Sequence, residues 1–182
     1  MRITGGEWAS RRALGPPAGS PLRPTPDALR EQAFAVLAPA LEGAVFLDLF
    51  AGTGVVSLEA LSRGAARVIL VDRARQALAL ARRNLASLAV AHDRFEVLPV
   101  AARQAVAVLA RRRVRCDLAW CDPPFGIWRE GVEALAAALA ARVLAPGARV
   151  VLEVPPRQEV AIAGFEVRRE LRGAVLLEVA EP

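Results

Sequence analysis

Lysine and tyrosine are absent from this sequence, and histidine occurs only once, as His92. The two cysteines, Cys116 and Cys121, lack C-x-x-C spacing and have no histidine beside them. This scarcity of suitable ligands argues against a zinc site, and we expect no metal centre. Both cysteines are predicted to pack as small apolar side chains in a reducing compartment.

Long apolar runs are also absent, since none approaches the ~20 residues that a membrane span requires. The opening Met1–Gly6 lacks the apolar core of a secretory signal. We therefore expect a soluble, cytoplasmic protein without a membrane partner. Hydrophobic residues make up 54% of the 182 residues, which favours a globular chain that can bury a substantial core.

All 24 basic residues are arginines, and the formal net charge is +5. Such an excess permits a polyanionic partner, although charge alone gives only solubility and non-specific attraction.

The chain divides by composition into a basic arm, residues 1–24, and a longer domain, residues 25–182. The arm is rich in Arg, Gly and Pro, and a short hairpin is expected in it. Thr25-Pro26-Asp27 is typical of a helix start, with the Thr25 hydroxyl as N-cap and proline at the first helical position. This helix is predicted to reach Leu41 and to bury Leu29, Phe34, Val36 and Leu37.

Beyond that helix, strands and helices alternate. Strands are predicted near 44–49, 67–72, 95–100, 117–121 and 148–154, and helices near 55–63, 74–88, 101–113 and 130–143, with Gly64 and Gly147 at turns. Two further strands, 164–171 and 174–180, meet at Gly173 as an antiparallel hairpin. The pattern predicts an α/β fold of seven strands, mostly parallel, with helices on both faces.

Two strand ends indicate a cofactor site. Leu47 to Gly54 closes an apolar strand with a glycine-rich turn, and Asp72 ends the next strand about 20 residues later, the spacing of a carboxylate that accepts hydrogen bonds from ribose hydroxyls. A dinucleotide fingerprint fails because Ser57 occupies its third glycine position, and a P-loop fails because no Gly-Lys-Ser/Thr follows. A purely structural strand–helix turn remains the alternative.

Asp122-Pro123-Pro124-Phe125 follows another apolar strand and indicates a reaction centre. The exocyclic amine of a nucleobase is a poor nucleophile because its lone pair is delocalised into the ring. The Asp122 carboxylate and the Pro123 carbonyl can accept its two hydrogens, which favours tetrahedral nitrogen. Phe125 offers a face for an extruded base. The alternative is a turn that only ends a strand.

These motifs give the chain a resemblance to a known family. From Arg2 to about Val179 it resembles the bacterial small-subunit rRNA guanine-N2 methyltransferases of the RsmD type, within the Rossmann-like class I methyltransferases. Besides Asp48–Gly54 and Asp122–Phe125, the resemblance rests on Arg2-Ile3-Thr4-Gly5-Gly6, Leu22-Arg23-Pro24-Thr25 continuing into Leu29-Arg30-Glu31, Leu58–Ala65 and Arg83-Asn84-Leu85. The Arg-Pro-Thr segment discriminates best, because generic methyltransferases with an Asp-Pro-Pro-Phe motif lack it.

The resemblance implies S-adenosylmethionine as cofactor. The residues expected to bind it are Thr25, Asp48, Phe50, Ala51, Gly52, Thr53, Gly54, Asp72, Arg73 and Ala102. In the family, the residue at the Thr25 position caps the methionine end of the cofactor. Two positions depart from the family pattern. Asp72 is shorter than the common Glu, and Ala101 or Ala102 replaces the Asp or Asn that often contacts adenine, so backbone and apolar groups would hold the adenine.

The arm is expected to contact RNA phosphates through Arg2, Arg11, Arg12 and Arg23, with a solvated arm as the alternative. The three tryptophans differ in expected role. Trp8 could anchor the arm or stack on a base, Trp120 belongs to the core, and Trp128 could border the substrate pocket. The run 111–115 is predicted at the opposite edge of the sheet as a solvated cluster.

The expected function is transfer of a methyl group from S-adenosylmethionine to the exocyclic N2 of a guanine in 16S rRNA. By resemblance, the substrate would be RNA within the small ribosomal subunit, and a monomer would suffice. One alternative is a DNA adenine-N6 methyltransferase, since the same motif serves any planar amine. Another is a non-catalytic RNA-binding factor for ribosome assembly, against which the intact Asp122–Phe125 motif argues.

Overall fold

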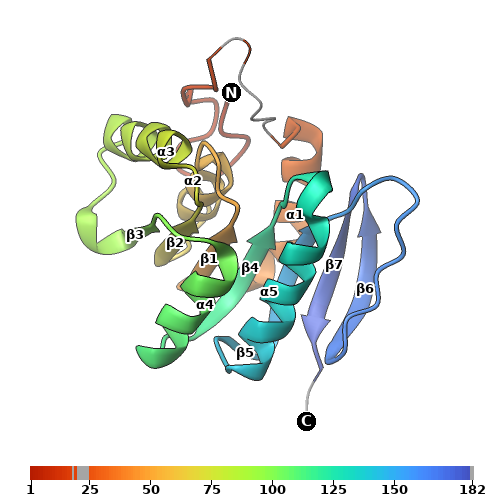
Figure 1. Cartoon of the computed structure of the whole chain (residues 1–182). Helices are drawn as coiled ribbons and strands as arrows, with labels where there is room; N and C mark the ends of the chain where they lie inside the picture. The colour runs from red at the N-terminus through yellow and green to blue at the C-terminus, as the bar shows by residue number, and fades with distance from the viewer. Residues whose placement is uncertain (18, 20–24, 181–182) are drawn as a thin grey trace.

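The computed structural model describes residues 1–17, 19 and 25–180. Its centre is one sheet in the order β3-β2-β1-β4-β5-β7-β6 (Figure 1). The strands are β1 (Val45–Leu49), β2 (Arg67–Val71), β3 (Phe95–Leu98), β4 (Cys116–Cys121), β5 (Leu144–Glu153), β6 (Phe165–Leu171) and β7 (Ala174–Val179). The seven predicted strands are confirmed, and so is the terminal hairpin at the sheet edge.

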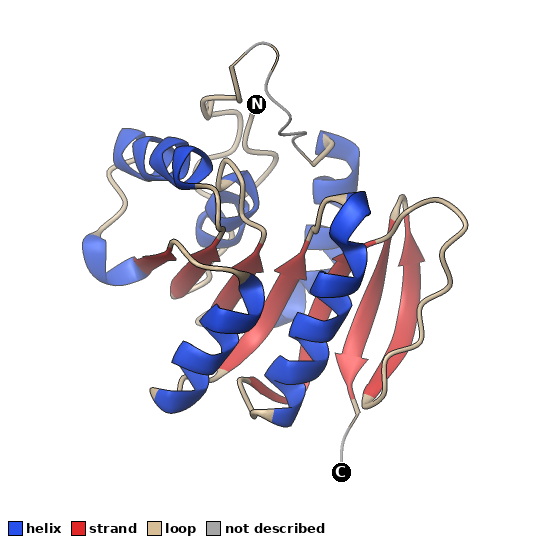
Figure 2. Cartoon of the chain, viewed as in Figure 1, coloured by secondary structure: helices blue, strands red, loops and turns tan. Residues whose placement is uncertain are grey.

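The strand order reverses at β1, which pairs in parallel with both β2 and β4. The parallel set runs from β3 to β5, and β7 and β6 then add antiparallel pairs. The arrowheads of β1, β2 and β4 point to the same end of the sheet, and the N-terminal segment lies at that end (Figure 2). Ligands of such sheets bind at the carboxyl ends of the strands, beside the point of reversal.

Helices cover both faces of the sheet, as predicted. They are α1 (Asp27–Leu37), α2 (Val55–Ser62), α3 (Arg75–Ser87), α4 (Ala102–Arg111) and α5 (Trp128–Ala140), with short 3-10 turns at Ala38–Ala40, His92–Arg94 and Phe125–Ile127. Figure 1 shows α4 and α5 on one face, whereas α1 and α2 lie on the other. Of the helices in the described ranges, none is long and apolar enough to cross a membrane.

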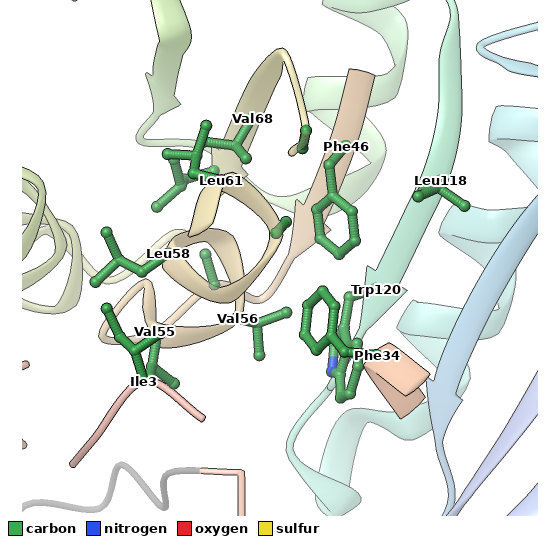
Figure 3. Packing of buried hydrophobic residues seen from close by; sticks show 14 of the residues in the cluster. Ile3, Phe34, Phe46, Val55, Val56, Leu58, Leu61, Val68, Leu118 and Trp120 are labelled. Carbon is green, nitrogen blue, oxygen red and sulfur yellow. The ribbon is translucent and has the colours of Figure 1, made fainter. Parts of the chain in front are cut away.

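Alternation along the strands divides the core between these two faces. Phe46 and Trp120 point towards α1, α2 and α3, and Leu47 and Cys121 point towards α4 and α5. On the first face Phe34 of α1 stacks between the other two aromatic rings, with ring centroids 6.0 Å from Phe46 and 5.8 Å from Trp120 (Figure 3). Trp120 is fully buried, so its predicted place in the core is confirmed.

A buried arginine joins the N-terminal segment to the helices. The Arg30 guanidinium is fully buried and donates to the carbonyl oxygens of Thr25 and Arg2, each at 2.6 Å. It also faces Glu59 of α2, whose carboxylate accepts the backbone N–H of Thr4 at 2.6 Å. Ile3 and Trp8 are buried as well, so the first part of the arm packs as core and Trp8 serves as an anchor.

The structure corrects three details. Thr25 is not the N-cap of α1: Pro26 holds that position with no side-chain cap, because the Thr25 hydroxyl donates to Glu153 instead. Val36 is only partly buried against the core. Gly147 lies inside β5 rather than at its start, because β5 begins at Leu144 and the pairing register with β4 shifts there.

We predict that Arg30→Met lowers the free energy of unfolding by about 3–5 kcal/mol, because it leaves the buried Glu59 carboxylate and two carbonyl oxygens short of partners. Urea denaturation would measure the loss. The control is Arg103→Ala, which removes an ion pair to Glu133 whose side chains are both exposed. Exposed pairs contribute ~0–1 kcal/mol, so equal losses in the two variants would contradict the role given to Arg30.

Candidate active site

The ends of four parallel strands meet at one edge of the sheet. Leu49 pairs with Val71 on one side and with Cys121 on the other, and Cys121 pairs with Leu152. The residues that follow these positions are therefore neighbours. The backbone confirms it, since the N–H of Ala51 donates to the Val71 carbonyl at 2.9 Å and that of Asp122 to the Leu49 carbonyl at 3.3 Å.

The turn after β1 folds as a cradle of left-handed residues. Phe50, Gly52 and Gly54 have φ values of 65°, 52° and 75°. At Gly54, an added Cβ would lie 3.0 Å from the Cβ of Ala81, so the loop packs directly on α3. Asn84 of α3 donates to the Thr53 carbonyl at 3.0 Å. Helix α2 starts here with Gly54 at its N-cap and without a side-chain cap from that residue.

Two carboxylates frame this cradle. Asp72 accepts the N–H of Gly52 at 2.9 Å and that of Ala74 at 2.8 Å, and so it is fixed at the end of β2. Asp48 is buried inside β1 and accepts the Ser57 hydroxyl at 2.6 Å. Burial raises the pKa of Asp48 to about 7, with smaller contributions from the charges of Asp72 and Glu153. Asp48 thus ties α2 to β1 beneath the loop.

The loop after β4 presents the predicted reaction centre. Pro123 is buried, and Phe125 keeps 57% of its surface exposed. Gly131 of α5 allows this geometry, because a Cβ there would lie 2.7 Å from Pro123 Cγ. Burial, together with the negative charges of Glu153 and Asp48, raises the pKa of Asp122 to about 8.

Glu153 at the end of β5 was missing from the predicted site. Its Oε1 accepts the Thr25 hydroxyl at 2.9 Å and the Trp120 indole N–H at 3.2 Å. Burial raises the pKa of Glu153, while its hydrogen bonds to Thr25, Trp120 and Asp122 lower it. The sequence signal was available, since an acid that closes the apolar run Val150–Leu152 follows the same strand-end rule as Asp72 and Asp122.

A surface depression of about 430 Å³ opens beside this loop. Trp128 lines it and anchors its indole N–H on the Glu153 backbone carbonyl at 3.0 Å. Trp128 therefore lines a depression beside the Asp122–Phe125 loop, and its place at a substrate pocket stays a prediction. The other residues of the lining are Phe125, Gly126, Ile127, Arg129, Glu130, Pro155 and Gln158.

Most of the remaining predicted site residues that the structure describes are exposed. Arg2 is exposed and pairs with Asp27 at 3.0 Å and Glu31 at 3.3 Å. Arg73 is also exposed, with Glu130 at 3.9 Å, and Ala102 is buried at the first position of α4. Arg11 and Arg12 are exposed, and Arg23 lies outside the described residues. The run 111–115 lies where α4 leads into β4, at the end of the sheet opposite the site.

The residues present fit an adenosyl cofactor that carries a positive charge. The left-handed loop gives close backbone approach, and the Asp72 carboxylate lies at the strand end where ribose hydroxyls bind. The carboxyl groups of Asp122 and Glu153 would face a sulfonium with opposite charge. Ala102 can offer adenine its backbone and an apolar contact.

The sheet order, the glycine loop after β1 and the carboxylate after β2 define a Rossmann-like methyltransferase fold. The chain belongs to the family described as Conserved hypothetical protein 95, whose model matches residues 1–178. It is 38% identical over 137 residues to the ribosomal RNA small subunit methyltransferase D of Escherichia coli strain K12. It is 35% identical over 125 residues to YlbH of Bacillus subtilis, provisionally assigned as an rRNA methyltransferase.

These alignments cover 74% and 69% of this chain, and 66% and 67% of the two relatives. Among solved structures, yhhF of Escherichia coli, provisionally assigned as a methyltransferase, superposes with a TM-score of 0.80 at 28% identity. That superposition covers 100% of this chain and 99% of the other. The family and the fold inferred from the motifs are therefore confirmed.

We predict that Gly131→Ala displaces the Asp122–Phe125 loop and lowers the melting temperature. Alanine in a helix is normally favoured over glycine by ~1 kcal/mol, but here its methyl group would overlap Pro123. Differential scanning calorimetry measures the change. Gly15→Ala is the control, because a Cβ there meets no atom within 4 Å. A melting temperature raised by Gly131→Ala would show that the contact does not constrain the loop.

A second prediction concerns pH. Burial raises the pKa of Asp48 to about 7 in the folded state, so its contribution to stability is present at low pH and is lost as pH rises to 7. We expect the unfolding free energy of wild type to fall by about 4 kcal/mol more than that of Asp48→Asn between about pH 4 and 7. Urea denaturation across this range tests it, with the exposed Asp93→Asn as control. Parallel curves for wild type and Asp48→Asn would contradict it.

Proposed function

We propose that this chain transfers a methyl group from S-adenosylmethionine to the exocyclic N2 of a guanine in 16S rRNA, within the small ribosomal subunit. The observation that carries the proposal is the register that puts the Asp122–Phe125 loop beside the glycine cradle and Asp72. The similarity to rRNA methyltransferases gives the substrate class. We propose a monomer as the working unit.

The cofactor supplies an activated methyl group on a positively charged sulfur. The Asp122 carboxylate and the Pro123 carbonyl accept the two N–H hydrogens of the amine and draw nitrogen towards tetrahedral geometry. The bound cofactor would supply its methyl group to the amine nitrogen and keep the electron pair of the broken sulfur–carbon bond, and Asp122 would accept the amine proton. Holding both reactants in line is the main contribution of the protein.

Phe125 and Trp128 would receive the base. Phe125 is exposed and Trp128 lines the adjoining depression, and stacking of a base on an aromatic ring contributes about 1–3 kcal/mol. Arg11 and Arg12 lie exposed on the arm, which Asn84 ties to the cofactor loop through hydrogen bonds to Leu14 at 2.7 and 3.1 Å. Phosphate contacts from this arm would orient the RNA without reading its sequence.

The prediction concerns Asp122→Ala, which removes a hydrogen-bond acceptor used in the transition state. We expect methyl transfer at saturating S-adenosylmethionine to fall by about 100- to 1,000-fold. The measurement is transfer of a labelled methyl group to small ribosomal subunits from a strain that lacks the endogenous enzyme. Naked rRNA and duplex DNA serve as alternative acceptors.

Label in a single guanine of the subunit RNA, lost in Asp122→Ala, is the expected result. Label in DNA adenine would show that the chain methylates N6 of adenine in DNA and not N2 of guanine in rRNA. Cofactor binding with no label in any acceptor would identify an RNA-binding assembly factor and overturn the proposal.

A further inference from the structure

Glu153 holds together three parts of the site. It closes β5 one residue after Leu152, whose partner Cys121 precedes Asp122, so the two acids end adjacent strands. The two carboxyl groups are close enough for the negative charge of Glu153 to raise the pKa of Asp122. The Thr25 hydroxyl joins Glu153 to the segment before α1, and Trp120 joins it to the aromatic core.

The hydrogen bonds from Thr25 and Trp120 do not require an acid. Both groups donate, so the amide oxygen of a glutamine would accept them equally well. The carboxylate adds a second negative charge beside Asp122. The two charges repel each other, because the site is partly buried and water screens them little. The charge of Glu153, rather than its hydrogen bonding, therefore needs a functional explanation.

The surroundings of Asp122 favour a shared proton. Glu153 of β5 and Asp48 of β1 are the charged groups that act on it, α5 presents Gly131 and Trp128, and the Arg30 guanidinium is engaged with the Thr25 carbonyl. Two adjacent carboxyl groups hold one proton between them rather than ionise together. Because Thr25 and Trp120 donate to Glu153, its ionised form is stabilised and the proton resides on Asp122.

We propose that Glu153 is a positioning residue that keeps a proton on Asp122 in the free protein, and that the pair releases this proton when the positively charged sulfonium binds beside it. The inference rests on the proposed function, which makes Asp122 the acceptor of the amine hydrogens. A protonated carboxyl group is a poor acceptor, so Asp122 becomes competent only once the methyl donor is in place. The proton passes to solvent, and no other bond changes.

Because the pKa of Asp122 is raised to about 8, most molecules still hold the one shared proton on Asp122 at neutral pH. A cation placed nearby favours ionisation and lowers that pKa. S-adenosylhomocysteine has the same groups apart from the methyl group, but its sulfur is neutral. The difference in proton release between the two ligands therefore isolates the effect of the sulfonium charge.

Isothermal titration calorimetry of the full chain at about pH 7, in two buffers of different ionisation enthalpy, counts the protons released. For wild type we expect S-adenosylmethionine to release more protons than S-adenosylhomocysteine, by a difference of about 0.5–1 per site. Equal release with the two ligands would overturn the proposal, whatever happens to any variant.

Glu153→Gln keeps an oxygen for Thr25 and Trp120 but removes the charge. We expect it to abolish most of the difference between the ligands while binding S-adenosylhomocysteine with affinity within about 2-fold of wild type. Glu133→Gln is the matched control, since it makes the same change at an exposed carboxylate that pairs with Arg103, so the difference should persist. A folded Glu153→Gln protein that retains the full difference would assign Glu153 a merely structural role.

The two proposals fail in different ways. The calorimetry contains no RNA, so an absence of methyl transfer to guanine leaves the proton count unaffected. Conversely, equal proton release with both ligands would leave the methyl-transfer assay free to succeed.

Discussion

The parallel pairing of β1 with both β2 and β4 is the constraint on which the rest of the structure depends. It places the ends of these strands side by side, so that residues far apart in sequence become neighbours at one edge. The glycine cradle, Asp72 and Asp122 owe their proximity to this register, and β5 adds Glu153 by the same rule. The core on both faces keeps the register fixed, because a slip of a strand by one residue would move each of its side chains to the opposite face of the sheet.

The edge of the sheet where the strands end gathers acidic residues in a protein whose net charge is +5. Asp48, Asp122 and Glu153 are buried enough to raise the pKa of each, which costs stability at neutral pH. A positively charged ligand would offset that cost, whereas the exposed arginines of the arm suit a polyanion. Acidic residues thus lie at the strand ends and exposed arginines on the N-terminal segment, which lies at the same end of the sheet (Figure 1).

The fold could be predicted from sequence because its signals are local. Apolar runs of strand length alternate with helical patterns, and glycines punctuate them, so all seven strands were located with small errors at their ends. Glu153 and Gly131 escaped prediction because their importance depends on which strand and helix pack beside the Asp122–Phe125 loop. The Thr25 hydroxyl was assigned to the helix cap for the same reason, since the sequence does not reveal a competing carboxylate 128 residues away.

The central claim is that one sheet edge holds the cofactor and the reacting amine together. A crystal structure of the chain with S-adenosylhomocysteine tests it most directly. The account predicts density along Gly52–Gly54, with the ribose hydroxyls on Asp72 and the sulfur facing the Asp122–Phe125 loop. Density elsewhere on the surface, or a sulfur turned away from that loop, would contradict it.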